Sequence, residues 1–193
     1  MFHDVTTWRH AEKAIAAGVD GLVCIGSGGG GHAGTVSHLI MVPRLRAIFD
    51  GTIIMAGAVA HGAAIRAAEV LGADLAYVGT RFIASVESMA PPEYKQMLID
   101  ATSDDLVFTQ LGGGGPARWL RPSASALGLD LNAAIVARTP DGVRPWKDVW
   151  SAGQGVDLIE DIAPVADLVD RLRGEYEAAA GVPVRATSRA AST

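Results

Sequence analysis

The chain is poor in cysteine, in aromatic residues and in clustered positive charge, and each shortage excludes a class of protein. Cys24 is the single cysteine among 193 residues, which excludes an internal disulfide and fits a reducing cytoplasm. The net charge is −5 with only 16 basic residues, and no basic cluster is present, so we expect no nucleic-acid partner. No apolar run approaches the roughly 20 residues of a membrane span, and the N-terminus does not read as a signal peptide. We therefore expect a cytoplasmic protein without a membrane partner.

Several familiar ligand-binding patterns are also missing. No group of His, Cys, Asp and Glu has the spacing of metal ligands. The glycine-rich segment 26–34 lacks the Gly-Lys-Ser/Thr ending of a Walker loop, and it matches the dinucleotide fingerprint poorly. We therefore predict no metal site, and any phosphate site must be built in another way.

What the chain does contain is an alternation of short apolar runs and helical patterns, which is typical of an α/β protein. The triplets Gly18-Val19-Asp20 and Gly72-Ala73-Asp74 both separate a helix end from a strand start. Their spacing corresponds to two βα units of about 27 residues each and indicates a parallel sheet. The strands are predicted at 2–6, 21–25, 52–56 and 75–78, and the helices at 8–17, 43–49, 62–71 and 92–102.

Two glycine turns follow successive strands and predict a phosphate clamp. Gly57 follows the run 52–56, and Gly79-Thr80 follows the run 75–78. The carboxyl ends of parallel strands meet at one edge of the sheet, where ligands bind. Backbone N–H groups at glycine turns and helix starts attract a phosphate dianion, and Thr80 adds a hydroxyl donor. Either turn alone is equally consistent with an ordinary loop glycine. Arg81 could supply charge there or be an exposed residue at a helix start.

His32 ends the run 26–31 and is the candidate catalytic residue. Glycines leave the imidazole unshielded, and histidine is a suitable general base near neutral pH. The alternative is a surface histidine on a flexible loop. His3 could face the same site, whereas His38 and His61 are expected to cap helices or to be solvated.

The pattern changes after residue 102. Residues 103–155 contain Gly112-Gly113-Gly114-Gly115-Pro116 and no clear period, so we expect an irregular extension. A helix is predicted at 158–176, with a stripe formed by Ile162, Val165, Val169, Leu172 and Tyr176. We divide the chain into a domain at 1–102, an irregular and helical extension at 103–180 that packs on it, and a disordered tail at 181–193.

An ordered set of motifs resembles the nitronate monooxygenase family, formerly called 2-nitropropane dioxygenases. The motifs are Gly30-Gly31-His32-Ala33-Gly34, Ala56-Gly57-Ala58-Val59, Tyr77-Val78-Gly79-Thr80-Arg81-Phe82, Tyr94-Lys95, Gly115-Pro116-Ala117-Arg118 and Ala152-Gly153-Gln154-Gly155. The resemblance extends to about residue 176. It implies the C-terminal half of an FMN-binding TIM barrel, a partial (β/α)8 barrel with about the last three βα units.

The resemblance also implies roles for individual residues. His32 would be the base that removes the α-proton of an alkyl nitro compound or steadies its nitronate, with O2 as the oxidant. FMN would be the cofactor, with its phosphate at Gly57 and Gly79-Thr80. The implied cofactor-binding residues are Gly30, Gly31, Gly57, Ala58, Tyr77, Val78, Gly79, Thr80 and Gln154.

Two departures from the family pattern leave alternatives open. The best-known branch has Gln at the position of Ile25 and Glu at the position of Gly28, which favours a different substrate. An FMN-dependent reductase of enoyl thioesters, such as enoyl-acyl-carrier-protein reductase, is the enzymatic alternative. A barrel enzyme that binds a sugar phosphate would explain the clamp alone.

The second departure from the family pattern is the absence of the first half of the barrel. We expect truncation, with a partner that carries the missing half or an inactive flavin- or phosphate-binding remnant as alternatives. A homo-oligomer is a further possibility for the assembly.

Overall fold

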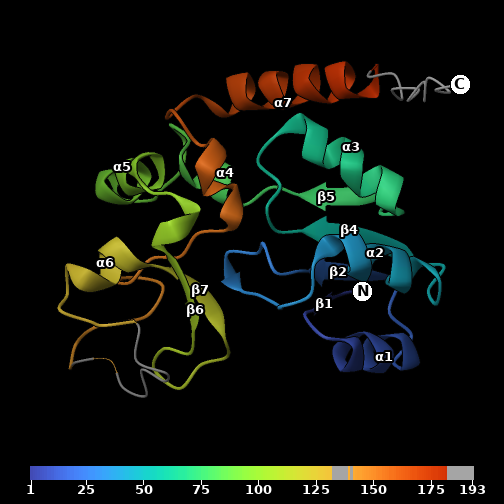
Figure 1. Ribbon diagram of the computed structural model, residues 1–193, viewed down its shortest axis with the longest axis horizontal. Helices are drawn as coiled ribbons and strands as arrows, with labels where there is room; N and C mark the ends of the chain where they lie inside the picture. The colour runs from blue at the N-terminus through green and yellow to red at the C-terminus, as the bar shows by residue number, and fades with distance from the viewer. Residues whose placement is uncertain (132–138, 140, 182–193) are drawn as a thin grey trace, which may run out of the picture.

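The structure is a computed structural model that describes residues 1–131, 139 and 141–181 (Figure 1). The strands are β1 (Phe2–Val5), β2 (Gly21–Ile25), β3 (Gly31–His32), β4 (Thr52–Ala56), β5 (Leu75–Tyr77), β6 (Leu106–Thr109) and β7 (Ala117–Leu120). The α-helices are α1 (Trp8–Ala16), α2 (His38–Arg46), α3 (Gly62–Leu71), α4 (Thr80–Ile83), α5 (Pro92–Asp100), α6 (Arg121–Ser125) and α7 (Val165–Ala180). Two 3-10 helices, η1 (Ser103–Asp105) and η2 (Gln154–Leu158), complete the described elements.

A four-stranded parallel sheet in the order β1-β2-β4-β5 confirms the predicted α/β fold. Helix ends follow the predicted signals. The Thr7 hydroxyl caps α1 by accepting from the His10 amide, and Gly72 ends α3 in the left-handed region at φ 104°. Because the strands are parallel, the loops after β1, β2, β4 and β5 all open at one edge of the sheet.

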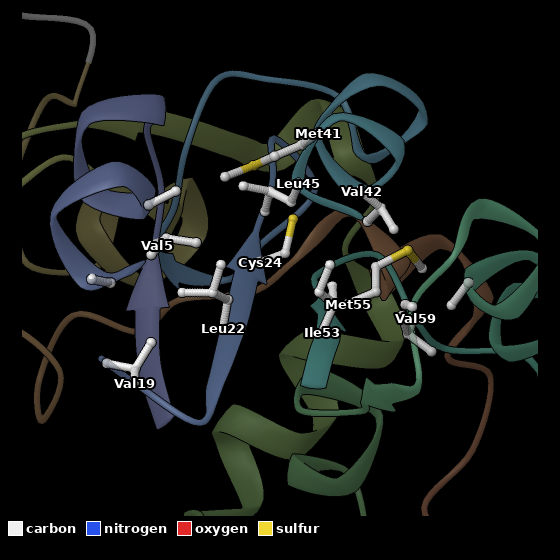
Figure 2. Close-up of a cluster of buried hydrophobic side chains, with 14 residues drawn as sticks. Val5, Val19, Leu22, Cys24, Met41, Val42, Leu45, Ile53, Met55 and Val59 are labelled. Atoms are coloured by element: carbon white, nitrogen blue, oxygen red, sulfur yellow. The ribbon is translucent and has the colours of Figure 1, made fainter. Parts of the chain in front are cut away.

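One face of the sheet packs against α1, α2 and α3, and Figure 2 shows the side chains between them. Val5, Leu22, Cys24, Ile53 and Met55 alternate along three strands and point to this face, where they are buried. Met41, Val42 and Leu45 of α2 cover them. The period of two in each strand therefore directs one set of side chains to the helices and leaves the other set for the opposite face.

The opposite face of the sheet is only partly covered. Val23 and Ile54 at its centre are buried. Toward the two outer strands, Phe2 is 51% exposed, Leu75 is 55% exposed and Tyr77 is 53% exposed. Within the described residues, β1 and β5 each pair with one neighbour only. This face therefore presents apolar surface and two free strand edges.

The prediction that residues 103–155 are irregular is wrong for part of that range. Strands β6 and β7 form an antiparallel hairpin, and β3 pairs with β7 to give a second sheet in the order β3-β7-β6. The register sets Gly31 opposite Arg118 and His32 opposite Ala117. This pairing joins the glycine-rich loop after β2 to the hairpin, across the proposed division at residue 102 (Figure 1).

Two helix boundaries differ from prediction. Helix α2 starts at His38, not at residue 43, because the Ser37 side chain caps it by accepting from the Leu39 amide; Pro43 lies inside the helix. Helix α7 starts after Pro164, not at residue 158. Its buried stripe consists of Leu168 and Leu172, while Val169 is exposed. The predicted tail lies outside the described residues, apart from Gly181.

None of the helices within residues 1–131, 139 and 141–181 combines the length and the hydropathy that a membrane span requires.

Candidate functional site

A cavity of about 320 Å³ lies at the edge of the parallel sheet where the strands end. This volume is at the lower end of the range for small-molecule sites, about 300–1,000 Å³. Side chains from all four strands reach the cavity, and glycine-bearing loops close it. The lining residues are Asp4, Val23, Ile25, Gly29, Gly30, Ala56, Gly57, Ala58, Val59, Ala60, Tyr77, Gly79, Thr80, Ile83, Ser151, Gly153 and Gly155.

Gly57 occupies a position that only glycine fits. Its φ is +109°, and a Cβ there would lie 2.5 Å from the Gly29 nitrogen and 2.7 Å from the Gly29 Cα. The loop after β2 and the loop after β4 therefore touch through their backbones. The next residue, Ala58, is also left-handed, at φ 58°, and its amide donates to the Gly28 carbonyl over 3.1 Å. Peptide planes, not side chains, thus form this wall of the cavity.

Gly79 and Thr80 lie at the β5 end of the cavity. A Cβ on Gly79 would meet no protein atom within 4 Å, so this position opens into free space. The Thr80 Oγ1 atom accepts a hydrogen bond from the Gly153 amide over 3.0 Å. Because a hydroxyl has one proton of its own to donate, the Thr80 hydroxyl retains a donor for a ligand.

The start of α3 contributes less than the sequence indicates. The Gly62 amide donates to Glu175 Oε2 over 2.7 Å, and the Ala63 amide donates to His61 Nδ1 over 3.0 Å, so the prediction that His61 caps a helix is confirmed. Arg81 is neither exposed nor aimed at the cavity. Its side chain is 3% exposed, and the guanidinium forms an ion pair with Asp161 at 2.5 Å.

Six of the residues predicted to bind a cofactor line the cavity: Gly30, Gly57, Ala58, Tyr77, Gly79 and Thr80. Three do not. Val78 packs toward the helix-covered core, and Gly31 pairs with Arg118 in the second sheet. Gln154 contacts the site through its backbone amide, which donates to the Gly28 carbonyl over 3.0 Å, and the residue itself is exposed.

His32 does not line the cavity. It lies in β3, is exposed, and its ring centroid is 5.1 Å from that of Trp146. Trp146 itself has φ 73°, an uncommon conformation for a bulky residue and one that often accompanies functional sites. The structure therefore brings His32 and Trp146 together, near but outside the cavity wall formed by Gly30.

The remaining histidines are not ligand-facing. The His38 Nε2 atom lies 2.8 Å from the Ala56 carbonyl oxygen, to which it donates in the Nε2-protonated tautomer. Burial lowers the pKa of His38, although the bond to Ala56 opposes this shift. His38 is therefore neither a cap nor a solvated residue but a link between α2 and the end of β4. His3 alternates with Asp4 along β1 and does not line the cavity.

Sequence analysis did not identify Asp4, Ser151, Gly153 or Gly155 as site residues. Asp4 is the only charged residue among the described lining residues, and it sits near the end of β1, opposite Val23. Its position at the end of the first predicted strand was the available signal. Gly153 and Gly155 flank Gln154, so the glycines of that motif, not the glutamine side chain, face the cavity. The described residues hold no group of three His, Cys, Asp or Glu able to bind a metal.

Comparison with known proteins gives a consistent family match. The model of the nitronate monooxygenase family matches residues 1–175. A Mycobacterium tuberculosis protein named as a monooxygenase is 36% identical over 142 residues, 68% of this chain and 38% of that protein. The nitronate monooxygenase of Paraburkholderia phytofirmans is 32% identical over 205 residues, 92% of this chain and 54% of that protein.

A third relative has a different named activity. The (3aS,4S,5R,7aS)-5-hydroxy-7a-methyl-1-oxo-octahydro-1H-indene-4-carboxyl-CoA dehydrogenase of Mycobacterium tuberculosis is 34% identical over 116 residues, 58% of this chain and 33% of that protein. The chain thus spans between 33% and 54% of the length of these relatives.

Among solved structures, a nitroalkane oxidase from Streptomyces ansochromogenes superposes with a TM-score of 0.76 at 27% identity. The match covers 93% of this chain and 58% of that one.

Proposed function

Because the chain belongs to the nitronate monooxygenase family, we propose that its cavity binds FMN and that the complete protein oxidises alkyl nitronates with O2. One observation carries the proposal. The cavity at the strand ends is walled by glycine peptides from four loops, with a free hydroxyl donor at its β5 end. Flat peptide surfaces suit a planar ring, and clustered N–H and O–H donors suit a phosphate.

The residues of the cavity fit the cofactor. The open space beside Gly79 and the hydroxyl of Thr80 suit the phosphate at the β5 end. The glycine peptides at residues 29 and 30, in the loop after β2, suit the ring. The arrangement also places Asp4, three strand spacings or about 14 Å from β5, far from the phosphate. FMN, when bound, would supply the electron acceptor for the oxidation.

In this proposal His32 moves the substrate proton. His32 follows Gly30 by two residues, a reach of at most about 7 Å, and its imidazole is open to solvent. Trp146 packs against the imidazole, with the two ring centroids 5.1 Å apart. A small movement of Trp146 would allow the imidazole to reach the α-carbon of a nitroalkane bound over Gly30.

We further propose that additional polypeptide covers the inner face of the sheet. The exposed side chains of Phe2, Leu75 and Tyr77 and the free edges of β1 and β5 support this, since such edges attract further strands. The cover would come from the same gene product, a second copy or a separate chain. A cytoplasmic location fits the single, buried Cys24.

The test combines cofactor and product. Purified protein is titrated with FMN, and nitrite release is followed in air with a neutral nitroalkane, which still carries the α-proton that His32 is proposed to remove. Binding of FMN together with His32-dependent nitrite release supports the proposal. His32→Ala should retain FMN and lose nitrite release. The control variant His10→Ala, which changes an exposed histidine on α1, should retain both. Failure to bind FMN contradicts the cofactor assignment. Unchanged turnover in His32→Ala removes His32 from the reaction.

Oxidoreduction of a thioester is the alternative. Ile25 stands in the cavity with Val23, Val59 and Ile83, an apolar wall suited to a hydrocarbon substrate. The name of the related CoA-ester dehydrogenase is consistent with this class. NADPH-driven turnover of an enoyl thioester, without nitrite release from nitroalkanes, would favour the alternative. If FMN binds and neither substrate is turned over, the chain is a flavin-binding fragment.

A further inference from the structure

Three successive carbonyl groups of the glycine-rich loop are held by hydrogen bonds from outside the loop. The Gly28 carbonyl accepts from the amides of Ala58 and Gln154, over 3.1 and 3.0 Å. The carbonyls on either side, of Ser27 and Gly29, both accept from the guanidinium of Arg118. The Nε–H of Arg118 donates to Gly29 over 3.3 Å, and Nη2–H donates to Ser27. One arginine therefore bridges two peptide groups of the loop.

These peptide groups belong to the cavity wall. Gly29 and Gly30 line the cavity, so Arg118 stands one hydrogen bond behind the wall. Backbone bonds also hold this stretch, because the Ser27 amide donates to the Val36 carbonyl over 2.9 Å and the Gly29 amide donates to the Gly26 carbonyl over 3.2 Å. Among the described residues, Arg118 is the only side chain with a hydrogen bond to a carbonyl of residues 27–29. Arg118 thus adds the side-chain restraint on the carbonyls of Ser27 and Gly29, which flank the backbone-bonded Gly28 carbonyl.

No carboxylate of the described residues forms an ion pair with Arg118. Its neighbours are the two carbonyls and the ring of Phe108, whose centroid is 5.6 Å from the guanidinium carbon. Burial lowers the pKa of Arg118, but an arginine remains protonated in proteins. A positive charge that is only partly solvated therefore stands behind the cavity wall.

We propose that Arg118 is a positioning residue of the flavin site, which holds the Ser27–Gly29 peptides against the cavity and supplies a positive field that favours reduced FMN. The inference rests on the proposed function. Two-electron reduction adds negative charge to the flavin ring, so an uncompensated cation nearby stabilises the reduced form more than the oxidised form. The charge of Arg118 should therefore raise the affinity for reduced FMN above the affinity that the loop geometry alone would give.

Three variants of the 193-residue chain separate the two contributions. Arg118→Met removes the charge and both hydrogen bonds. Arg118→Lys keeps the charge but cannot bridge both carbonyls in the same geometry. Arg173→Met removes an equal charge from an exposed site on α7, where Arg173 forms an ion pair with Asp170, and serves as the matched control.

The first measurement does not involve FMN. Hydrogen exchange of the free chain is compared in residues 26–34. Arg118→Met should increase exchange there at least about tenfold relative to Arg173→Met, with Arg118→Lys in between. Unchanged exchange in a folded Arg118→Met chain overturns the positioning role. If Arg118→Met does not fold, Arg118→Lys carries the same test, and unaltered exchange in that variant overturns the role.

The second measurement titrates oxidised FMN and chemically reduced FMN separately. Arg118→Met should weaken binding of both, and of reduced FMN by about threefold or more beyond the loss for oxidised FMN. Arg118→Lys should weaken both equally, because it keeps the charge. If Arg118→Met loses the same affinity for oxidised and reduced FMN, the proposed electrostatic preference for reduced FMN is overturned. If the parent chain binds no FMN, the proposed function and the electrostatic role of Arg118 are both contradicted. Faster hydrogen exchange in residues 26–34 of Arg118→Met would still support the positioning role.

Discussion

The Gly153 amide donates to the Thr80 hydroxyl over 3.0 Å, and this bond joins the loop after β5 to the segment before η2. A residue of the extension is thereby fixed against the sheet edge at the place where the phosphate is proposed to bind. The bond uses an acceptor site of the Thr80 hydroxyl, so the hydroxyl proton is left for the ligand.

Thr80→Val tests this dual role, because valine has the shape of threonine without the hydroxyl. It should leave the Gly153 amide without its acceptor and cost about 1–3 kcal/mol of stability. It should also weaken FMN binding about tenfold or more. Thr80→Ser, which keeps the hydroxyl, should bind FMN within about threefold of the parent chain. Urea unfolding and FMN titration measure the two effects, and equal affinity in Thr80→Val would remove the hydroxyl from the clamp.

Gly57→Ala tests the contact between two loops. The added Cβ would meet the Gly29 backbone at 2.5 Å at a φ of +109°, so we expect a loss of at least about 2 kcal/mol. Gly174→Ala is the control. It adds a Cβ that meets nothing within 4 Å on α7, and it should raise stability by about 0.5–1 kcal/mol. Chemical denaturation compares the two, and a Gly57→Ala chain as stable as the parent would disprove the close approach.

Gly79→Ala separates ligand contact from folding. Its φ of −105° suits any residue, and the Cβ would meet no protein atom within 4 Å. The unfolding free energy should therefore change by less than about 0.5 kcal/mol. If the phosphate lies in this space, the methyl group should weaken FMN binding several-fold. Unaltered FMN affinity would mean that the phosphate lies elsewhere.

His38 should make stability depend on pH. Burial holds the pKa of His38 below its usual value of 6.5, against the opposing effect of the bond to the Ala56 carbonyl, so the folded chain favours the neutral imidazole. The contribution is complete above pH 6.5 and is lost as the pH falls through the lower, folded-state pKa. His38→Gln should reduce this loss on acidification, whereas His10→Gln, at an exposed site on α1, should not. Unfolding measured from pH 7.5 to pH 5 distinguishes them; parallel curves for all three chains would contradict the assignment.

Much of the sheet was predictable, because its signals are local. The apolar runs 21–25 and 52–56 and the glycines at 18 and 72 fix elements within a few residues of themselves. Gly57 and Gly79 could be placed at one edge because parallel strands share their carboxyl ends. The location of these two glycines beside the cavity therefore follows from the parallel strand order, and no contact between distant segments had to be predicted.

The second sheet was not predictable in this way. Strand β7 pairs with Gly31 and His32, which lie in a glycine-rich segment with no strand pattern. The contact of His32 with Trp146 depends on that pairing and on the left-handed backbone of Trp146. The start of α2 depends on the Ser37 cap, which competes with the proline signal at residue 43. The role of Gly153 depends on a hydrogen bond between distant segments.

Comparison of FMN with riboflavin tests the central claim most directly. The two ligands share the flavin ring and differ in the phosphate, so their affinities for the same chain isolate the clamp at Gly79 and Thr80. A titration of the purified protein should give FMN an affinity at least about tenfold higher than that of riboflavin, a difference of about 1.4 kcal/mol. Equal affinities, or no binding of either ligand, would contradict a phosphate-anchored flavin site in this cavity.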